Sequence, residues 1–264
     1  MIHPTALIDP AAQIDPTAEI GAYVIIEGPA KVGPRVKVLP HAQVIGDTTI
    51  GADSSIGRGA VIGELPQDLS FDPAVESGVI IGEGNVIREH VTIHRGSKPG
   101  SMTRFGSRNF IMGGAHFAHD VQLGDRNVVA NAALLAGHVQ VGSNSFIGGG
   151  AVFHQFVRIG DYCIVQGNGG LGKDLPHFCC AQRINRMTGL NVIGLRRAGF
   201  SSSDRTAIKE AFDLIFRSGM NLSQAVAKAA EREWPECCRK FLGFVGTQSK
   251  RGICPVRQGQ SEED

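Results

Sequence analysis

The sequence has almost no net charge and no long apolar run. Its 26 Lys and Arg residues oppose 25 Asp and Glu residues, which leaves a formal net charge of +1. This balance gives no electrostatic reason to expect nucleic acid or a membrane surface as the partner. No window of about 18 apolar residues occurs, and the start at Met1 has neither a basic region nor a long apolar stretch. We therefore expect a soluble, cytoplasmic protein without stable membrane insertion.

The cysteines do not indicate a disulfide framework. There are six of them, including two adjacent pairs, and no C-x-x-C spacing occurs. They are Cys163, Cys179, Cys180, Cys237, Cys238 and Cys254. This usage is typical of reduced thiols in a cytosolic protein.

What the sequence has instead is a strict period of six. Large apolar residues occupy every sixth position from 105 to 171: Phe105, Ile111, Phe117, Leu123, Val129, Leu135, Val141, Ile147, Phe153, Ile159, Val165 and Leu171. An α-helix repeats every 3.6 residues and a strand every two, so this period fits neither. It predicts a parallel β-helix, in which three hexapeptides form a triangular coil and the periodic side chain points into the prism.

The glycine content agrees with a turn-rich repeat. The 35 glycines are about twice the usual share of roughly 7%, without the every-third spacing of collagen. Gly, Asn, Asp and Ser crowd the residues after the ladder positions, as in Leu123-Gly124-Asp125 and Val141-Gly142-Ser143-Asn144. We expect these residues to adopt positive φ, which a corner every six residues demands.

The same register is present from the amino terminus, at Ile8, Ile14, Ile20, Ile26, Val32, Val38, Val44, Ile50, Ile56 and Ile62. It breaks near residues 64–79, resumes at Ile81, Ile87 and Ile93, and breaks again at 94–104. Insertions in a repeat protein leave as loops from one face and usually carry function, so these two could wall a common cleft. The hexapeptides amount to about eight coils, a prism roughly 40 Å tall.

The period changes after Leu171. We expect an irregular link from Pro176 to Asn185 and then helices. The first would follow the possible caps Ser202, Ser203 and Asp204, the second would begin near Asn221, and the third would lie around 241–245. The predicted organisation is a β-helix domain at 1–185, a helical domain at 186–256 and a disordered tail at 257–264.

Four histidines lie on the ladder: His116, His119, His138 and His154. The first two are in adjacent hexapeptides, and His119, His138 and His154 follow one another at spacings close to one coil. Such spacings predict a column of imidazoles along one edge of the prism. Imidazole suits general base catalysis near neutral pH because its pKa is about 6.5. Asp120 could orient His119, but neighbours on a straight strand point to opposite faces, so this requires a corner or an indirect contact.

Two other interpretations compete with catalysis. Any one histidine could be structural, although a column bordered by glycines such as Gly113 and Gly114 is harder to explain in that way. A zinc site is the second rival, but the H-x-x-x-x-H pair of β-helical carbonic anhydrases does not occur. We expect no metal.

Five motifs around these residues point to one family. They are Thr92-Ile93-His94-Arg95-Gly96, His116-Phe117-Ala118-His119-Asp120, Leu135-Ala136-Gly137-His138-Val139, His154-Gln155-Phe156 and Asn191-Val192-Ile193-Gly194-Leu195-Arg196-Arg197-Ala198-Gly199-Phe200. In this order they closely resemble the acyl-ACP:UDP-N-acetylglucosamine O-acyltransferases that open lipid A synthesis. The similarity extends over nearly the whole chain.

The resemblance implies a fold, an assembly and a reaction. The fold would be a left-handed parallel β-helix of hexapeptide repeats followed by a small α-helical C-terminal domain, assembled as a homotrimer with active sites between subunits. The reaction would transfer a 3-hydroxyacyl chain from acyl carrier protein to the glucosamine 3-position of UDP-N-acetylglucosamine. Acyl carrier protein would be the donor substrate, and no cofactor is expected.

The resemblance also implies residue roles. His119 would be the general base, Asp120 would support it, and the Gly137 N–H would hold the oxyanion. Sugar and acyl chain would be positioned by Asp68, His116, His138, His154 and Gln155. The uridine diphosphate would be reached by His94, Asn191 and Arg197.

Three residues depart from the pattern of the best-known members. Ser70 replaces a lysine, Ile193 an acidic residue and Ala198 the second of two arginines, and Arg183 or Arg186 could compensate. Two alternatives therefore stay open. The first is a paralogous acyltransferase using a 3-amino sugar nucleotide or another donor such as acyl-CoA, and the second is a catalytically inactive β-helical binding protein.

Overall fold

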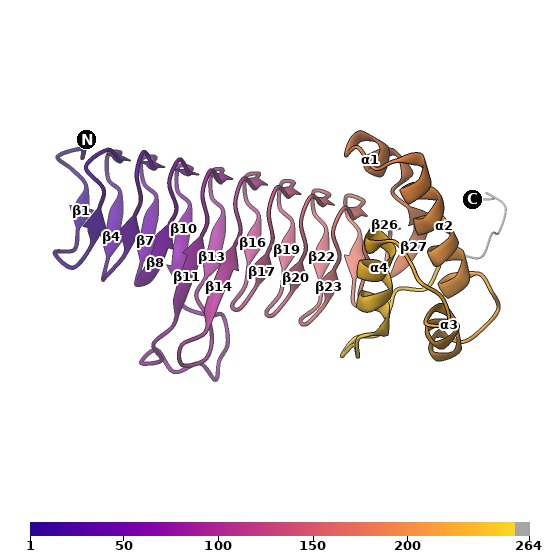
Figure 1. Ribbon diagram of the computed structural model, residues 1–264. Coiled ribbons are helices and arrows are strands. Elements are labelled where there is room, and N and C mark those ends of the chain that lie inside the picture. The colour runs from indigo at the N-terminus through magenta and orange to yellow at the C-terminus, as the bar shows by residue number, and fades with distance from the viewer. Residues whose placement is uncertain (257–264) are drawn as a thin grey trace.

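The chain coils into a three-sided prism with helices at its carboxyl-terminal end (Figure 1). The structure is a computed structural model, and it describes residues 1–256. The expected disordered tail at 257–264 lies outside the described residues. The fold is a left-handed parallel β-helix followed by helices, which confirms the predicted fold class.

Each side of the prism is one sheet within the described residues. The first sheet contains β1 (Leu7–Ile8), β4 (Ile25–Glu27), β7 (Gln43–Ile45), β10 (Val61–Glu64), β13 (Thr92–His94), β16 (His116–Phe117), β19 (Leu134–Leu135), β22 (Val152–Phe153) and β25 (Gly170–Leu171). The second contains β2 (Gln13–Ile14), β5 (Lys31–Val32), β8 (Asp47–Ile50), β11 (Gly78–Ile81), β14 (Met102–Phe105), β17 (Gln122–Leu123), β20 (Gln140–Val141) and β23 (Arg158–Ile159). The third contains β3 (Glu19–Ile20), β6 (Lys37–Val38), β9 (Ser55–Ile56), β12 (Val86–Ile87), β15 (Phe110–Ile111), β18 (Val128–Val129), β21 (Phe146–Ile147), β24 (Ile164–Val165), β26 (Cys179–Gln182) and β27 (Arg186–Leu190).

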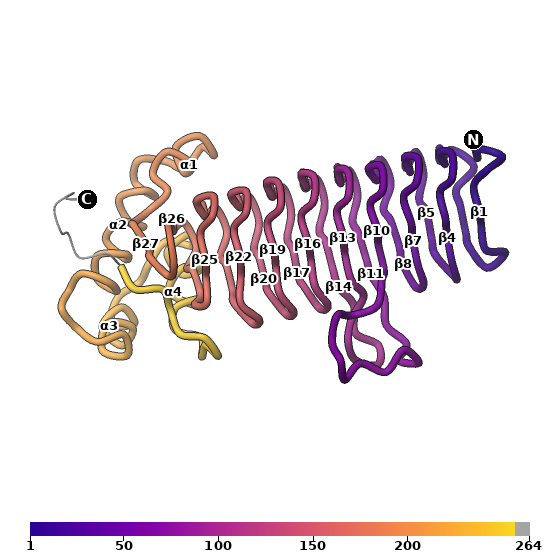
Figure 2. Tube along the Cα trace, turned by 180° about the vertical axis from the view of Figure 1, so that it is seen from behind, coloured from indigo at the N-terminus to yellow at the C-terminus, as the bar shows by residue number. Residues whose placement is uncertain are grey.

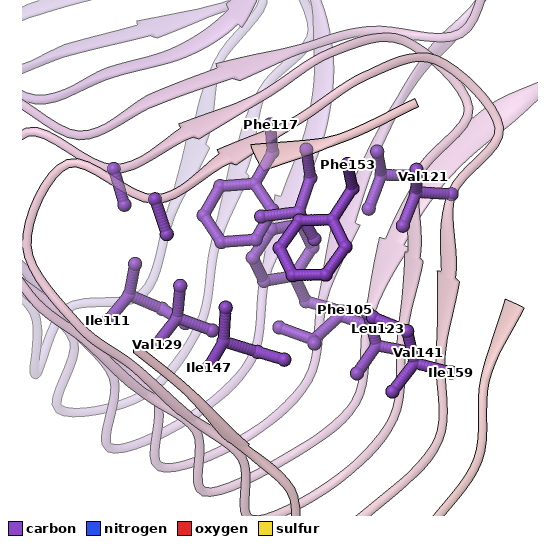
Figure 3. Close-up of a cluster of buried hydrophobic side chains, with 14 of the residues drawn as sticks. Phe105, Ile111, Phe117, Val121, Leu123, Val129, Val141, Ile147, Phe153 and Ile159 are labelled. Atoms are coloured by element: carbon purple, nitrogen blue, oxygen red, sulfur yellow. The ribbon is translucent and has the colours of Figure 1, made fainter. Parts of the chain in front are cut away.

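The ladder residues fill the inside of the prism. Phe117 pairs with Leu135 and Leu123 with Val141, so residues one coil apart stack on each other. Figure 3 shows stacks of this kind, with Ile111, Val129 and Ile147 in one and Leu123, Val141 and Ile159 in another. Fully burying an aliphatic or Phe side chain contributes about 1.5–3 kcal/mol. Because the coil buries every sixth residue, the period of six favours this fold.

Each corner of the middle coils has one residue with positive φ, three positions after the ladder residue. These residues are Gly114, Asp120, Arg126, Ala132, His138, Asn144, Gly150, Phe156, Tyr162 and Asn168. The expectation is confirmed at Asn144, which has φ 60°, but it is wrong for Gly124 and Asp125, because Arg126 takes this conformation in their coil with φ 53°. Gly124 is needed for a different reason: a Cβ there would lie 2.6 Å from the carbonyl oxygen of Gly142 in the next coil.

Both insertions emerge between the first and second sheets. Residues 65–77 connect β10 to β11, and residues 95–101 connect β13 to β14. They project together from one side of the prism (Figure 2). We call this edge of the prism the first corner; farther along it lie residues 118–121, 136–139 and 154–157.

Four helices follow the prism in the described chain: α1 (Val192–Arg197), α2 (Ser202–Phe216), α3 (Leu222–Ala229) and α4 (Glu236–Gly246). The last three confirm the expected helices, whereas α1 was not predicted. Asn221 caps α3 as expected. The cap of α2 is Ser201, whose Oγ accepts a hydrogen bond from the Asp204 N–H, so the cap predicted at Ser202 to Asp204 is wrong.

The segment between Pro176 and Asn185 is not an irregular link. It contains β26, which pairs in parallel with β24 and antiparallel with β27. The sequence signal is weak because Cys180 and Ala181 are smaller than the usual ladder residues. The boundary predicted between residues 185 and 186 falls within this β26–β27 hairpin, and the first helix begins at Val192.

Two further observations concern the whole described chain. None of the helices within residues 1–256 combines the length and the apolar character needed to cross a bilayer. All six cysteines lie in this range, and none forms a disulfide.

Candidate active site

The first corner brings His119 and Asp120 into direct contact. The Nδ1 atom of His119 lies 2.8 Å from Oδ2 of Asp120, and both residues are at least nine-tenths buried. Asp120 has φ 61°, so the chain turns at this residue and two consecutive side chains can meet. An ionised carboxylate only accepts hydrogen bonds, so Nδ1 carries the proton and Nε2 of neutral His119 keeps its lone pair.

Asp120 is held in its ionised form. Burial by itself would raise the pKa of this carboxyl, but hydrogen bonds from His119, Ser97 and Ser101 outweigh burial and keep the pKa well below its usual range. Oδ2 accepts from both Oγ and N–H of Ser97, at 2.6 and 3.1 Å. Ser97 belongs to the second insertion, and nothing in the sequence motifs indicates this contact.

The predicted column of four imidazoles differs from the observed one. The His119 and His138 rings meet edge to face at 5.0 Å, and the next ring is Phe156, stacked on His138 at 4.6 Å. His154 instead lies exposed, with Nδ1 3.2 Å from the carbonyl oxygen of Gln155, which is also exposed. Phe156 follows His138 by one coil, so the spacing could have identified it.

Gly137 lies directly beneath the His119 ring. A Cβ at this position would be 2.5 Å from Cε1 and 2.6 Å from Nε2 of His119. The Gly137 N–H donates to no acceptor within residues 1–256, whereas the next N–H, that of His138, donates to the His119 carbonyl. A free backbone donor therefore sits close to Nε2.

His94 and His116 form a second pair of rings, with centroids 5.0 Å apart. Thr92 Oγ1 lies 2.7 Å from Nδ1 of His116 and fixes the orientation of that ring. Burial, helped by repulsion from His94 when both rings are protonated, lowers the pKa of His116 to about 4, and burial also lowers the pKa of His94. Both are neutral at pH 7. His94 is 4% exposed, and its Nδ1 has no partner in the described chain.

Asp68 lies on the first insertion. Its Oδ1 accepts hydrogen bonds from the N–H and Oγ of Ser70, and these bonds lower the pKa of the carboxyl. The charge of His119 lowers this pKa slightly further, so the loop brings Asp68 within electrostatic reach of the first corner. Ser70, one of the departures from the family pattern, is thus tied to Asp68.

Asn191 and Arg197 are not brought to the histidines of the same chain. Both belong to α1 and its cap, beyond the last coil of the prism (Figure 1). The Asn191 side chain accepts from the Gly194 N–H and donates to the Tyr162 carbonyl, both at 2.9 Å. Arg197 is exposed, as are the departures Ile193 and Ala198.

The donor set of the first corner also meets one requirement of a metal site. One ligand atom each of His119, Asp120 and His138 lies within 4.8 Å of the others. Burial lowers the pKa of His138, which keeps it neutral and able to bind a cation, while nearby Asp120 opposes this shift. Two of these three side chains are already arranged as a hydrogen-bonded base, because Nδ1 of His119 is engaged by Asp120, whereas Nε2 of His138 lies 3.8 Å from Asp120 Oδ2.

Comparison with protein families defines the class. Residues 29–64 match the bacterial transferase hexapeptide repeat, and residues 174–254 match the second domain of UDP-N-acetylglucosamine O-acyltransferase. The chain is therefore a hexapeptide-repeat transferase whose carboxyl-terminal part is of the O-acyltransferase type.

Curated relatives and solved structures identify the family. The chain is 47% identical over 198 residues to the acyl-ACP:UDP-N-acetylglucosamine O-acyltransferase of Syntrophobacter fumaroxidans, covering 73% of this chain and 75% of the relative. It is similar to the UDP-N-acetylglucosamine acyltransferase structure from Campylobacter jejuni, with TM-score 0.90, 36% identity and 98% and 100% coverage. The Francisella novicida structure gives TM-score 0.91, 30% identity and 97% and 94% coverage. The chain belongs to the acyl-ACP:UDP-N-acetylglucosamine O-acyltransferase family.

Proposed function

We propose that the protein transfers a 3-hydroxyacyl chain from acyl carrier protein to the glucosamine 3-hydroxyl of UDP-N-acetylglucosamine, the first step of lipid A biosynthesis. Membership of the family supports the reaction. The observation that carries the mechanism is the contact of His119 with Asp120, which leaves Nε2 free beside the unpaired N–H of Gly137.

His119 acts as the general base in this proposal. Nε2 takes the proton of the sugar hydroxyl while the hydroxyl oxygen attacks the thioester carbonyl carbon. The tetrahedral intermediate then collapses, the C–S bond breaks, and the proton passes from His119 to the departing sulfur. General base catalysis typically contributes about 10²–10⁴-fold. Asp120 keeps the proton on Nδ1 and stabilises the imidazolium that forms during the reaction.

Gly137 supplies the donor for the oxyanion. Its N–H has no competing acceptor in the described chain, and the absence of a Cβ lets the base approach. Asp68, His116, His138, His154 and Gln155 would position sugar and acyl chain. His116 and His138 are neutral near pH 7, so they can donate or accept hydrogen bonds without adding charge.

A homotrimer would complete the site. The outward side chains Leu134 and Val152 of the first sheet and Phe146 of the third are 42–46% exposed, whereas the second sheet presents the polar residues Gln122 and Gln140. Exposed apolar side chains on two of the three sides fit a symmetric assembly around an axis parallel to the prism. A neighbouring subunit would then bring Asn191 and Arg197 toward uridine diphosphate. Light scattering should give three times the 28.0 kDa chain mass, and a monomer would contradict the shared site.

His94 and Asn191 are not placed to contact a ligand directly. His94 is buried behind His116, and Asn191 already uses both polar side-chain atoms. We propose that His94 acts through His116, and that Arg197 is the direct contact for the nucleotide. The charge of an arginine suits a pyrophosphate.

No metal or cofactor takes part in the proposed reaction, and the acyl carrier protein is the donor substrate. Activity should persist after dialysis against a chelator. Loss of activity that zinc restores would instead assign the donor atoms of His119, Asp120 and His138 to a metal. A cytoplasmic location follows from the proposed donor and fits six unpaired cysteines.

A second acceptor is favoured by the departures from the family pattern. Ser70 binds Asp68 instead of offering a cation, and Ile193 and Ala198 leave an apolar surface on α1. These residues support a paralogous activity with a 3-amino sugar nucleotide, which would give an amide product, or with another donor such as acyl-CoA. Arg183, exposed beyond the last complete coil, could compensate for the missing cations.

The test is acyl transfer by the purified protein, with 3-hydroxyacyl carrier proteins of several lengths offered to UDP-N-acetylglucosamine and its 3-amino analogue. Acyl-CoA competition identifies the donor. Transfer that collapses in His119→Ala supports the proposal and reports both specificities. Ligand binding without turnover in intact protein would favour the β-helical binding protein instead.

A further inference from the structure

The second insertion forms hydrogen bonds with Asp120, the acidic partner of the proposed base His119. Oδ2 of Asp120 accepts hydrogen bonds from Ser97 Oγ at 2.6 Å and Ser97 N–H at 3.1 Å, on the same oxygen that binds Nδ1 of His119. Ser97 lies 23 residues before Asp120 in sequence. The contact therefore joins a loop of one coil to the base of the next.

The backbone of Asp120 is anchored to the strand that follows the same loop. Its N–H donates to Oγ1 of Thr103 at 2.8 Å, and Thr103 is fully buried. Gln122 Nε2 donates to the Met102 carbonyl at 2.9 Å. Side chain and main chain of Asp120 are thus both fixed from residues 97–103.

The loop that carries Ser97 is itself immobilised. The Gly96 carbonyl accepts a buried hydrogen bond of 2.6 Å from Ser77 Oγ, and the Gly100 N–H donates to the Glu76 carbonyl at 2.8 Å. A Cβ on Gly96 would lie 2.3 Å from the Ser101 carbonyl oxygen, so the loop closes tightly on itself. The end of the first insertion thus supports the second, which supports Asp120.

This arrangement controls the direction of a short side chain. A carboxylate at a corner has several rotamers, and its Oδ2 must lie in the plane of the His119 ring to hold the proton on Nδ1. Two donors from Ser97 hold Oδ2, and the Ser101 side chain adds a further hydrogen bond to the carboxylate. Supporting hydrogen bonds of this kind orient reactive groups, and their loss typically costs about 10–100-fold in activity.

We propose that Ser97 is a positioning residue of the enzyme: it fixes Asp120, and through Asp120 it fixes the tautomer and the ring of His119. Thr103 holds the backbone of the same residue by accepting the Asp120 N–H. The inference rests on the proposed general-base function. Ser97 touches no reacting atom, so its effect passes through Asp120 alone.

The experiment compares Ser97→Ala, Ser97→Thr and wild type in the transfer assay, each also in an Asp120→Ala background. Ser97→Ala should lower kcat about 10–100-fold with the KM for the nucleotide sugar almost unchanged. Ser97→Thr keeps the hydroxyl and should recover most of kcat. In the Asp120→Ala background Ser97→Ala should have no further effect, because the coupled partner is gone. An unchanged kcat, or an equal loss in both backgrounds, would overturn the inference.

A second readout does not depend on turnover. Nitrogen NMR of protein labelled at histidine should report the Nδ1–H tautomer of His119 in wild type and Ser97→Thr, and a mixture of tautomers in Ser97→Ala. If wild type transfers no acyl chain, the proposed function fails while this tautomer comparison still decides the role of Ser97. Identical spectra in all three proteins would contradict the positioning role.

Discussion

Two corners of the same prism have the same backbone and different chemistry. We call the edge between the second and third sheets the second corner; it includes Asp125, Ser143 and Asp161. Here the N–H two positions after the ladder residue donates to a side chain of the next coil, as in Asp125 N–H to Ser143 Oγ at 3.0 Å and Ser143 N–H to Asp161 Oδ1 at 2.7 Å. At the first corner the corresponding Gly137 N–H donates to no acceptor in residues 1–256.

The difference teaches where a repeat protein can place a site. Both corners carry a residue with positive φ, Asp120 or His138 at one and Arg126 or Tyr162 at the other, so backbone strain does not distinguish them. What differs is the use of polar groups. At the second corner the backbone N–H groups and polar side chains form hydrogen bonds between neighbouring coils. At the first corner Nε2 of His119 and the N–H of Gly137 are left available.

Two buried histidines provide the strongest test of this comparison. His119 is 9% and His177 8% exposed, but Nδ1 of His177 accepts the Asp161 N–H at 2.7 Å and its ring packs on Phe244 of α4. His119→Ala should lose about 10²–10⁴-fold of activity with little change in melting temperature. His177→Ala should retain activity but lose about 1–3 kcal/mol of unfolding free energy, because it leaves a buried N–H unpaired. Calorimetry and the transfer assay on both variants test this. Loss of stability in His119→Ala together with loss of activity in His177→Ala would contradict the comparison.

Two glycines form the next pair. A Cβ on Gly137 would meet the side chain of His119, which can swing away, whereas a Cβ on Gly124 would meet the backbone of Gly142, which cannot. Gly137→Ala should lower kcat by about 10²–10³-fold through displacement of the base and the oxyanion donor, at nearly wild-type stability. Gly124→Ala should cost about 1–3 kcal/mol through overpacking. A stable and fully active Gly137→Ala protein would contradict the proposal that the Gly137 N–H binds the oxyanion.

The imidazoles near the first corner should make the fold sensitive to mild acid. The pKa of His116 falls from 6.5 to about 4 on folding, and those of His94 and His138 fall as well. Between pH 6.5 and about 4 the unfolded chain binds more protons, so stability is full above pH 6.5 and decreases as the pH falls through this window. The lowered pKa of Asp120 acts only at lower pH. His116→Gln should reduce the slope of melting temperature against pH. An unaltered slope would show that His116 does not contribute to the loss of stability in mild acid.

The smallest effect is expected at an exposed ion pair near the amino-terminal end. Arg35 and Asp53 form two hydrogen bonds of 2.6 and 2.7 Å, but their side chains are 62% and 54% exposed. Solvent and salt screen such pairs. Arg35→Gln should leave activity unchanged and barely shift the melting temperature. A clear loss of stability that added salt does not reduce would show that this pair also joins the coils.

Some features of the site could be predicted and others could not. The motifs identify His119 and Gly137 as candidates, and the one-coil spacing identifies the ring position that Phe156 occupies. The hydrogen bonds from Ser97 to Asp120 have no signal in the sequence, because the length and path of the insertion determine that contact. The same holds for Asn191, whose amide is committed to capping α1.

The sequence by itself determined the coil. A large apolar residue at every sixth position gains burial only if three short strands close into a triangle, and this fixed the three-sided coil and the inward stacks, although not β26 at the end of the third sheet. Tertiary structure decided the chemistry. Only the turn at Asp120, the stacking of one coil on the next and the folded insertions bring the His119 ring over Gly137 and Ser97 onto the carboxylate. The physical reason is that hydrophobic burial follows a simple period, whereas hydrogen bonds depend on directions that a period does not encode.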